Sequence, residues 1–403
     1  MASVTQAARP LPAEAVPLVE ALGRVLADDV ASADDVPPFD NSAMDGYALR
    51  ARDSAAAAPA APVGLRLVGE SRAGAPAEAP VGDGEAALIS TGAVVPAGAD
   101  AVVPLEDVSE EGGEVKLTAP IEQGAEIRRA GEDIRAGETV VTAGTVLGPA
   151  EVGVLASVGA AEVRCARRPR VAVVTTGDEL TPPGEPLSPG GIRNSNAFAV
   201  PAQARAGGCD VVMVETAGDE PAATAAVIGR GLAADVLVIC GGVSVGRHDH
   251  VKAALAELDV EQRFWGIALR PGRPTWFGAG RDGTPLVFGL PGNPVSAMVT
   301  FRLLVIPAVA VMTGRPAPGE TLRAVLDEPY AKTPGRLHAV RCSMILADDG
   351  WHARPTGPQG SHVLTSMLGA DGLAMIPAEH GDVEAGAIVE VLPLNPNPAA
   401  PSR

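Results

Sequence analysis

The sequence predicts a multidomain protein built around a doubly wound, mostly parallel α/β domain, with N-terminal helical and β segments and a C-terminal all-β domain. The chain has 403 residues, which is long for a single hydrophobic core. Over residues 169–315, continuous runs of Val, Ile and Leu alternate with helical segments, as in a parallel sheet covered on both faces. On both sides of this stretch, glycine and proline separate short β-like segments, which indicates β domains.

The N-terminal part is predicted to be a discontinuous domain formed by residues 1–45 and 140–168. Within it, residues 13–30 have the apolar stripe of a helix that ends in a strand. Residues 34–45 form a loop rich in Pro, Asp and Asn. Residues 46–139 are predicted to be a separate β-rich domain, because turn residues interrupt their short β-like segments at close intervals.

The α/β domain is predicted over residues 169–315, and a β domain over 316–394 and a proline-rich flexible tail over 395–403 follow it. The alternation of strands and helices in the α/β domain is typical of a doubly wound fold. The predicted strands cover residues 171–175, 210–215, 236–240 and 285–289, and the predicted helices cover residues 196–206, 221–232, 250–258 and 295–312.

The charge of the chain argues against nucleic acid and anionic membranes as partners. The formal net charge is −18, whereas both of these partners require a basic surface. The lysines are Lys116, Lys252 and Lys332, so nearly all positive charge is guanidinium. Guanidinium groups suit bidentate contacts to phosphate and other oxyanions. The base composition of the genome is an equally good explanation for the scarcity of lysine.

No export or membrane signal is predicted. The N-terminal residues lack the apolar core of a signal peptide. The longest apolar stretch, Met298–Met312, is interrupted by Arg302 and Pro307 and is predicted to be too short to span a bilayer. The four cysteines are far apart and lack the spacing of a metal or redox site, so we expect buried, reduced thiols. Together these features predict a cytoplasmic protein.

Three predicted strands of the α/β domain end in loops with polar or glycine residues. Thr176–Leu180 follows the first strand, Gly241–Gly246 follows the third, and Leu290–Pro294 follows the fourth, directly before a helix. The carboxyl ends of parallel strands meet at one edge of the sheet, where ligands bind beside helix N-termini. The sequence therefore predicts a binding site at this edge.

Phosphate and magnesium fit the first two loops. Gly241 and Gly242 would let backbone N–H groups approach a phosphate, and Ser244 would add a hydroxyl group. The alternative is that this loop is only a tight turn. Asp178 and Glu179 fit a magnesium site for a phosphate anhydride, or else a solvated turn in which they cap a helix.

The third loop and the basic residues carry weaker signals. The Pro291–Pro294 run could present its backbone to a ligand at Gly292 and Asn293, or serve only as a rigid helix entry. Arg270 and Arg273 flank a Pro-Gly turn, and we favour an anion site over two surface charges.

Asp249 lies between His248 and His250, directly after the glycine loop. Residues two apart point to different sides of a helix, and no third nitrogen or sulfur ligand lies nearby in sequence. A zinc site is therefore disfavoured. We expect Asp249 to act as a second magnesium ligand or as a carboxylate that positions water.

Several short motifs follow one another along the chain. They are Pro38–Ala48, Ile127–Ile134, Thr175–Leu180, Gly241–Gly246 with Asp249, Arg270–Pro274, Gly289–Pro294, Thr333–Arg336 and Gln359–His362. With these motifs in this order, from about residue 10 to 393, the chain resembles the molybdopterin molybdenumtransferases, which are the MoeA proteins and the insertase domain of gephyrin.

The resemblance implies an elongated homodimer with four domains in each chain. It implies that Asp45, Thr91 and Asp133 of one subunit join Asp178, Glu179 and Asp249 of the other in a shared site. Asp45, Asp133, Asp178, Glu179 and Asp249 would be catalytic, and the last three would hold Mg²⁺. The substrate-binding residues would be Thr91, Gly177, Gly241, Gly242, Ser244, Gly246, Arg270, Arg273, Pro291, Gly292, Asn293, Pro294 and Ser361.

The reaction implied is the transfer of molybdate to adenylylated molybdopterin with release of AMP, which yields molybdenum cofactor. Other proteins of cofactor synthesis are possible partners. Family members commonly carry a basic residue directly after the Trp that precedes the Pro-Gly turn, but here Gly266 follows Trp265, so one anion contact is in doubt.

Two alternative functions remain open at this point. One is the related adenylyltransferase, which activates molybdopterin with ATP and is similar over the α/β domain only. The other is a non-catalytic molybdopterin-binding scaffold. The flanking β domains argue against the first, and the absence of a linker or low-complexity segment argues against the second.

Overall fold

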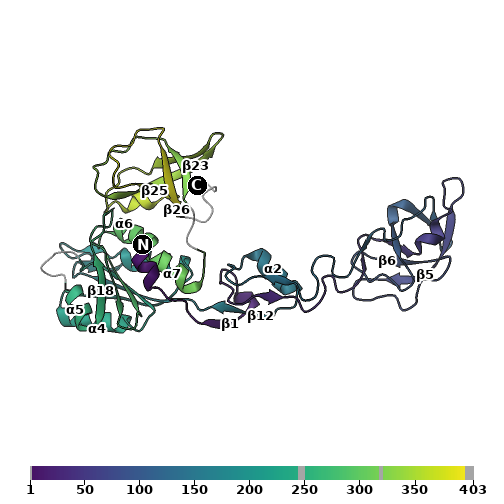
Figure 1. The fold of residues 1–403 in the computed structure, drawn as a ribbon, viewed down its shortest axis with the longest axis horizontal. Helices are drawn as coiled ribbons and strands as arrows, with labels where there is room; N and C mark the ends of the chain where they lie inside the picture. Colours follow the sequence, from purple (N-terminus) through teal and green to yellow (C-terminus); the bar gives the residue numbers. More distant parts are fainter. Residues whose placement is uncertain (1, 244–249, 317–320, 395–403) are drawn as a thin grey trace.

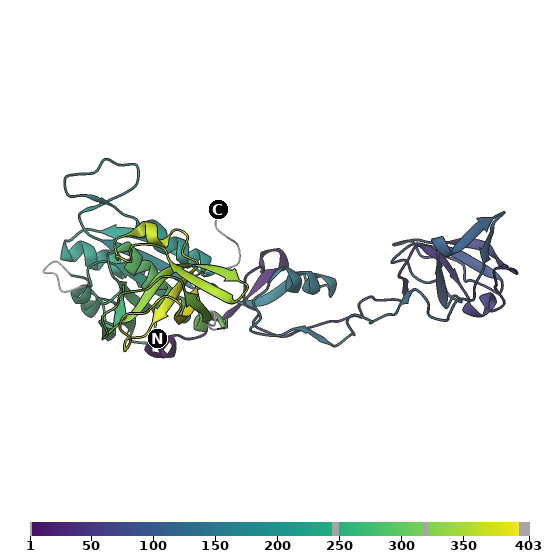
Figure 2. The ribbon, with the colours of Figure 1, turned by 90° about the horizontal axis from the view of Figure 1, so that it is seen from above.

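The chain forms four units in an extended molecule (Figures 1 and 2). The structure is a computed structural model that describes residues 2–243, 250–316 and 321–394. The α/β unit and the C-terminal β unit lie together at one end, and a β-rich unit lies at the far end. A small N-terminal unit lies between these two ends.

The small N-terminal unit is built on the antiparallel pair β1 (Ala13–Pro17) and β12 (Glu162–Ala166), with α2 (Pro149–Ser157) against it. The helix predicted over residues 13–30 is wrong, because β1 leads into a one-turn 3₁₀ helix, η1 (Leu18–Glu20). Pro17 has no N–H to continue a strand or a helix. Pairing with β12 buries Val16. This contact with a strand distant in sequence favours the extended conformation over the helix that the local pattern predicts.

The first helix of the chain belongs to the α/β unit. α1 (Ala2–Ala7) packs against α7 (Ile306–Thr313), and Val4 is fully buried in that core. The backbone N–H of Leu11 donates to the Met312 carbonyl at 2.7 Å. The start of the chain therefore lies outside the N-terminal unit to which residues 1–45 were assigned from the sequence.

Paired segments connect the N-terminal unit to the far β-rich unit. β2 (Val30–Ala31) pairs with β11 (Thr139–Val141), and β3 (Asn41–Ser42) pairs with β10 (Ile127–Arg128). The β-rich unit contains a mixed sheet in the order β7-β4-β6-β5-β9-β8. Its strands are β4 (Gly46–Leu49), β5 (Val63–Ser71), β6 (Glu85–Ile89), β7 (Ala101–Pro104), β8 (Val108–Glu111) and β9 (Glu114–Leu117).

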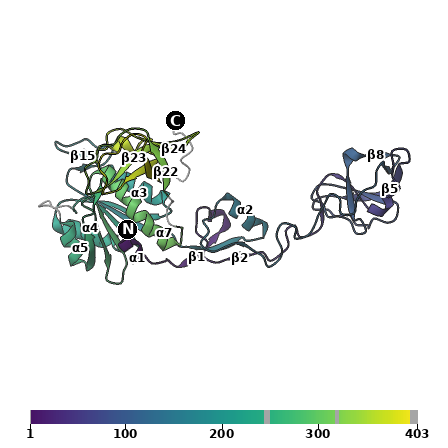
Figure 3. The same ribbon diagram turned by 45° about the horizontal axis from the view of Figure 1, so that its top comes forward.

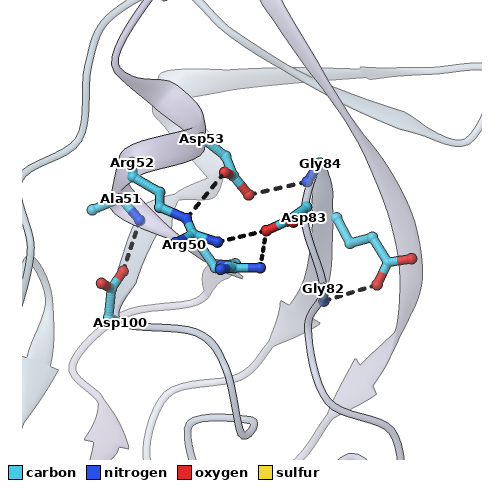
Figure 4. A network of polar contacts seen from close by, with 9 residues as sticks. Arg50, Ala51, Arg52, Asp53, Gly82, Asp83, Gly84 and Asp100 are labelled. Carbon is cyan, nitrogen blue, oxygen red and sulfur yellow. Dashed lines mark hydrogen bonds and ion pairs between the residues drawn. The ribbon is translucent and has the colours of Figure 1, made fainter.

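A polar network ties the turn after β4 to the loop before β6 (Figure 4). Arg50 and Arg52 both donate to the Asp83 carboxylate, and the Gly84 N–H donates to Asp53 at 3.0 Å. Asp83 is largely exposed, so these ion pairs contribute modestly to stability and mainly fix the geometry of the loop.

The α/β unit contains a six-stranded sheet in the order β16-β13-β17-β21-β20-β18. Its parallel part is formed by β16, β13, β17 and β21, whereas β20 runs antiparallel to β21 and β18. The strands are β13 (Arg170–Thr176), β16 (Asp210–Ala217), β17 (Val236–Cys240), β18 (Val260–Trp265), β20 (Trp276–Gly280) and β21 (Leu286–Leu290). The sequence predicted the four parallel strands but neither β18 nor β20.

Helices cover both faces of this sheet (Figure 3). Side chains of β13 alternate between two cores. Val171 and Val173 lie in the core that includes α3, α6 and α7. Ala172 and Val174 lie in the core on the other face, which includes α4 and α5. This explains the continuous apolar runs, since neither face of the strand meets water. The helices are α3 (Asn196–Ala206), α4 (Pro221–Gly231), α5 (Val251–Glu257) and α6 (Pro294–Thr300).

A long apolar helix lies in the core of the α/β unit. α6, a π-helical turn (Phe301–Val305) and α7 are continuous over Pro294–Thr313, and these 20 residues have the length and hydropathy of a membrane span. The prediction that this stretch is too short was therefore wrong, because Arg302 and Pro307 do not end the helix. However, most of it is buried inside the fold, where it fills the core beside the sheet.

The C-terminal unit is a small β barrel. β23 (Leu337–Ala347) pairs with both β24 (Gly350–Pro355) and β25 (Gly372–Ile376), and β22 (Leu322–Leu326) and β26 (Ile388–Pro393) complete the ring. A short strand from the α/β unit, β19 (Leu269–Arg270), pairs with β23 and joins the two units.

All four cysteines of the chain are buried and unpaired, as predicted.

His352 on the outside of the barrel is held between two carboxylates. Its Nδ1 lies 2.7 Å from Asp327 and its Nε2 lies 2.9 Å from Asp349. Both ring nitrogens can donate only in the imidazolium form. These hydrogen bonds, the one to Asp327 first, raise the pKa of His352 above its usual value.

We predict that His352→Gln destabilises the protein at acidic pH and has little effect at alkaline pH. A raised pKa in the folded state stabilises the protein fully below about pH 6.5, and this contribution disappears as the pH rises through the folded-state pKa. The measurement is the thermal unfolding midpoint of wild type and variant at about pH 5.5 and pH 9. The exposed His362→Gln is the control, and an equal loss at both pH values would contradict the prediction.

Candidate active-site cleft

A cleft of about 310 Å³ lies at the carboxyl edge of the α/β sheet. Loops that follow β13, β16, β17 and β21 contribute to it, because these parallel strands all end at the same edge. The cleft is lined by Thr176, Gly177, Glu179, Asp219, Thr224, Gly241, Gly242, His250, Val251 and Gly292.

The glycines after β17 allow a close approach of backbones. Gly241 and Gly242 have φ values of +98° and +65°, which side chains rarely adopt. A Cβ atom on Gly241 would lie 2.7 Å from Thr176 Oγ1, so this residue has no room for a side chain. The Gly241 N–H donates to the Leu290 carbonyl at 3.0 Å, and the Gly242 backbone borders the cleft.

Two carboxylates line the cleft, but they are not the pair expected from the sequence. Glu179 folds back over Gly177 and lines the cleft together with Asp219 from the loop after β16. Asp178, in contrast, accepts the Asp219 N–H at 3.1 Å and does not line the cleft. Asp178 therefore holds the loop that presents Asp219.

Asn194 holds the ends of β13 and β16 together. This buried side chain donates to Thr175 Oγ1 at 2.8 Å and to Thr216 Oγ1 at 3.1 Å. Its Oδ1 accepts the Ala197 N–H at 3.2 Å in the first turn of α3. Thr224 in turn donates to the Gly218 carbonyl at 2.9 Å, so polar side chains fix the strand ends below the cleft.

The Pro-Gly-Asn-Pro loop is fixed from two sides. The buried Asn196 donates to the Gly292 carbonyl at 2.7 Å, and Asn293 donates to Ser361 of the barrel at 2.8 Å. The buried Arg341 supports the loop before Ser361, because its guanidinium donates to the Gly360 carbonyl at 3.2 Å. Pro291 is buried and Pro294 begins α6. The structure thus brings Asn293 and Ser361 together from two units.

Arg270 and Arg273 do not line the cleft. Both are exposed, and Arg270 belongs to β19 at the junction with the barrel. Burial and the positive charges of Arg270, Lys332 and Arg336 lower the pKa of His338 to about 4, so this imidazole is neutral. The junction is therefore electropositive and remains a candidate anion site separate from the cleft.

Asp45, Thr91 and Asp133 lie in or beside the β-rich unit at the far end of the chain. Asp45 accepts both the Thr91 N–H at 2.7 Å and its hydroxyl at 3.1 Å, so these two residues form one polar cluster. Asp133 is exposed on the returning segment. A single chain does not bring these residues to the α/β cleft.

Three predicted site residues, Ser244, Gly246 and Asp249, lie outside the described residues. Among residues 2–243, 250–316 and 321–394, no three His, Cys, Asp or Glu side chains are grouped closely enough to hold a metal ion. Glu179 and Asp219 nevertheless provide two hard oxygen donors in the cleft, which is the ligand type that Mg²⁺ prefers.

Sequence reasoning missed Thr176, Asp219, Thr224, Asn194 and Asn196. Asp219 could have been predicted from the sequence, because the loops after parallel strands form the ligand-binding edge of such a sheet. It follows the parallel strand β16 and precedes a helix that begins at Pro221. The two asparagines had no such signal. Their role depends on strand ends and a loop that come together only in the folded chain.

Family models match most of the chain. A MoeA N-terminal region (domain I and II) matches residues 1–159, a probable molybdopterin binding domain matches residues 172–311, and a MoeA C-terminal region (domain IV) matches residues 323–394. The chain thus has the three MoeA regions in sequence order.

Relatives of full length give the same result. Molybdopterin molybdenumtransferase 2 of Mycobacterium tuberculosis is 39% identical over 399 residues, which covers 97% of this chain and 96% of that protein. The Haemophilus influenzae molybdopterin molybdenumtransferase is 36% identical over 96% of this chain and 95% of that protein. The crystal structure of the molybdopterin biosynthesis MoeA protein from Pyrococcus horikosii superposes with a TM-score of 0.83, at 35% identity over 98% of this chain and 97% of that one. The chain therefore belongs to the MoeA family of molybdopterin molybdenumtransferases.

Proposed function

We propose that this protein is a molybdenum insertase, which transfers molybdate to adenylylated molybdopterin and releases AMP. The observation that carries the proposal is the cleft, in which glycine backbone and two carboxylates meet at the carboxyl edge of the sheet. Glycine backbone suits a phosphate, and carboxylates suit the cation that accompanies a phosphate anhydride. Both flanking β regions match the family models, which disfavours an adenylyltransferase built on the α/β domain alone.

Each wall of the cleft has a distinct role in this reaction. Gly241 and Gly242 let the anhydride approach the backbone, and Asn196 keeps the Gly292 carbonyl in place on the neighbouring loop after β21. Fixed positions matter because holding two reactants in the correct geometry supplies a large part of catalysis. Mg²⁺, held by Glu179 and Asp219, would neutralise phosphate charge and polarise the anhydride.

The junction between the α/β unit and the barrel supports an approach route for molybdate. Arg270 and Arg273 are exposed there, and the neutral His338 adds no charge of its own. Arginine offers planar donors that match an oxyanion. Asn293 and Ser361 connect this junction to the Pro-Gly-Asn-Pro loop beside the cleft. We propose that molybdate first binds at this junction.

We also propose that the protein works in the cytoplasm, where its buried thiols stay reduced.

The reaction itself provides the first test. Purified protein incubated with adenylylated molybdopterin, Mg²⁺ and molybdate should release AMP, and omission of either molybdate or Mg²⁺ should abolish the release. AMP is quantified by chromatography. Consumption of ATP with release of pyrophosphate would establish the adenylyltransferase instead, and binding without turnover would establish the scaffold.

A second prediction concerns the carboxylates of the cleft. Glu179→Gln and Asp219→Asn keep the shape of the side chain and remove its charge, so each should reduce molybdate-dependent AMP release by about 100-fold. Glu185→Gln, an exposed carboxylate on the loop that follows, is the matched control and should retain full activity. Normal rates in both cleft variants would remove the proposed magnesium site.

We also propose that the protein is a homodimer with shared active sites. Asp45 and Thr91 form a polar cluster at the far end of the chain, where no part of the cleft of the same chain reaches them. In a two-fold symmetric dimer, the Asp45–Thr91 cluster of each subunit would lie at the cleft of the other subunit. Closed symmetry makes these two contacts equivalent. The extended shape of the chain supports this arrangement.

Subunit mixing tests the shared site. Asp45→Ala and Glu179→Ala should each be inactive as homodimers, and subunit exchange should restore one intact site in each heterodimer. Random exchange of equal amounts makes about half of the dimers heterodimers, so roughly a quarter of wild-type activity should return. If native mass spectrometry verifies exchange and no activity returns, Asp45 does not act across a dimer.

A further inference from the structure

No lysine or arginine is among the described residues that line the cleft, so a phosphate there depends on neutral donors as well as on a cation. Several donors of the cleft are already engaged. The N–H groups of Gly177 and Gly241 donate to backbone carbonyls at the ends of neighbouring strands, at 3.1 and 3.0 Å. The Thr224 hydroxyl donates to the Gly218 carbonyl at 2.9 Å. Each of these groups has one hydrogen atom, and none is left for a ligand.

Thr176 has a donor that is still available. It is the last residue of β13, it lines the cleft, and it is partly buried. Among the residues that the structure describes, no group forms a hydrogen bond with its hydroxyl. The preceding Thr175 differs, because its hydroxyl lies 2.9 Å from Thr216 Oγ1 and accepts from Asn194 at 2.8 Å. Successive side chains of a strand point to opposite faces, so only one of the two threonines serves the internal network.

The hydroxyl of Thr176 lies against the glycine loop. A Cβ atom on Gly241 would lie 2.7 Å from Thr176 Oγ1, and one on Gly242 would lie 3.0 Å from it. Glycine at both positions therefore leaves room beside the hydroxyl. The Gly242 N–H also has no acceptor in the described part of the chain. Two donors from neighbouring loops are thus available in the same part of the cleft.

These donors lie next to the carboxylates of the cleft. β13 lies between β16 and β17 in the sheet, so Thr176 ends between the loop that carries Asp219 and the loop that carries Gly242. A phosphate anhydride has several oxygen atoms, and a cation at Glu179 and Asp219 leaves some of them to other partners. A hydroxyl group can bind such an oxygen without adding a positive charge, which would compete with Mg²⁺ for the carboxylates.

We propose that Thr176 is a phosphate-binding residue of the cleft, whose hydroxyl donates to an anhydride oxygen beside the Gly242 N–H. The proposal deepens the insertase function and rests on it for the identity of the substrate. Mg²⁺ binding remains with Glu179 and Asp219. The role of Thr176 is binding alone, so its hydroxyl keeps its proton throughout.

Binding of inorganic pyrophosphate with Mg²⁺, measured by isothermal titration calorimetry, tests this role without turnover. Thr176→Val replaces the hydroxyl with a methyl group of similar size. The loss of one hydrogen bond to a charged oxygen should weaken pyrophosphate binding about ten-fold. Thr176→Ser retains the hydroxyl and should bind within about two-fold of wild type.

Two further variants separate ligand contact from structural effects. Thr139→Val makes the same chemical change at an exposed residue of β11 and should bind like wild type. Thermal unfolding provides the second readout. Thr176→Val should keep the wild-type midpoint, because the hydroxyl has no partner to lose in the described structure. Thr175→Val should lower the midpoint, because it removes a buried acceptor of Asn194.

The outcomes that overturn the proposal are distinguishable. If wild type binds pyrophosphate and Thr176→Val binds it equally well, Thr176 is not a phosphate ligand, and the insertase function is untouched. If Thr176→Ser does not restore binding, or if Thr176→Val lowers the unfolding midpoint as Thr175→Val does, the side chain has a structural role instead. If wild type does not bind pyrophosphate at all, the cleft is not an anhydride site, and both proposals fail.

Discussion

Parallel pairing of β13, β17 and β21 is the constraint on which the candidate site depends. Their registers end together at Thr175, Cys240 and Leu290, so the loops that follow open onto one edge. Each backbone loop must then pass close to its neighbour, and glycine at residue 241 provides the space. A side chain there would collide with Thr176, which would separate the loops and open the cleft.

Polar side chains maintain this edge where the ladder of backbone hydrogen bonds ends. Asn194 joins the ends of β13 and β16, and Asn196 holds the loop after β21. Both asparagines are buried, so the loss of either would leave donors and acceptors without partners in the interior. Rigidity at this edge suits a reaction in which two anions must be brought together. The two anions repel each other, and the charges that offset this repulsion act best when their positions are fixed before the reaction.

The extended shape separates two sets of candidate residues. Paired strands carry the Asp45–Thr91 cluster to the far end of the molecule, while the cleft and the basic junction lie at the other end. Within the near end, β19 and the Asn293–Ser361 hydrogen bond connect the α/β unit to the barrel. The barrel is thus coupled to the cleft through backbone and side-chain contacts, whereas the β-rich unit of the same chain is not.

The sequence by itself determined the α/β architecture and its parallel strands, because strands buried on both faces require continuous apolar runs. It also determined which loops form the cleft, because parallel strands of this kind all end at one edge of the sheet. It also indicated Glu179, Gly241, Gly242 and Gly292 as residues of that edge. Only the tertiary structure decided that Asp219 rather than Asp178 faces the cleft and that residues 13–17 form a strand. In each case the deciding partner is distant in sequence, and contacts of that kind leave no local pattern to read.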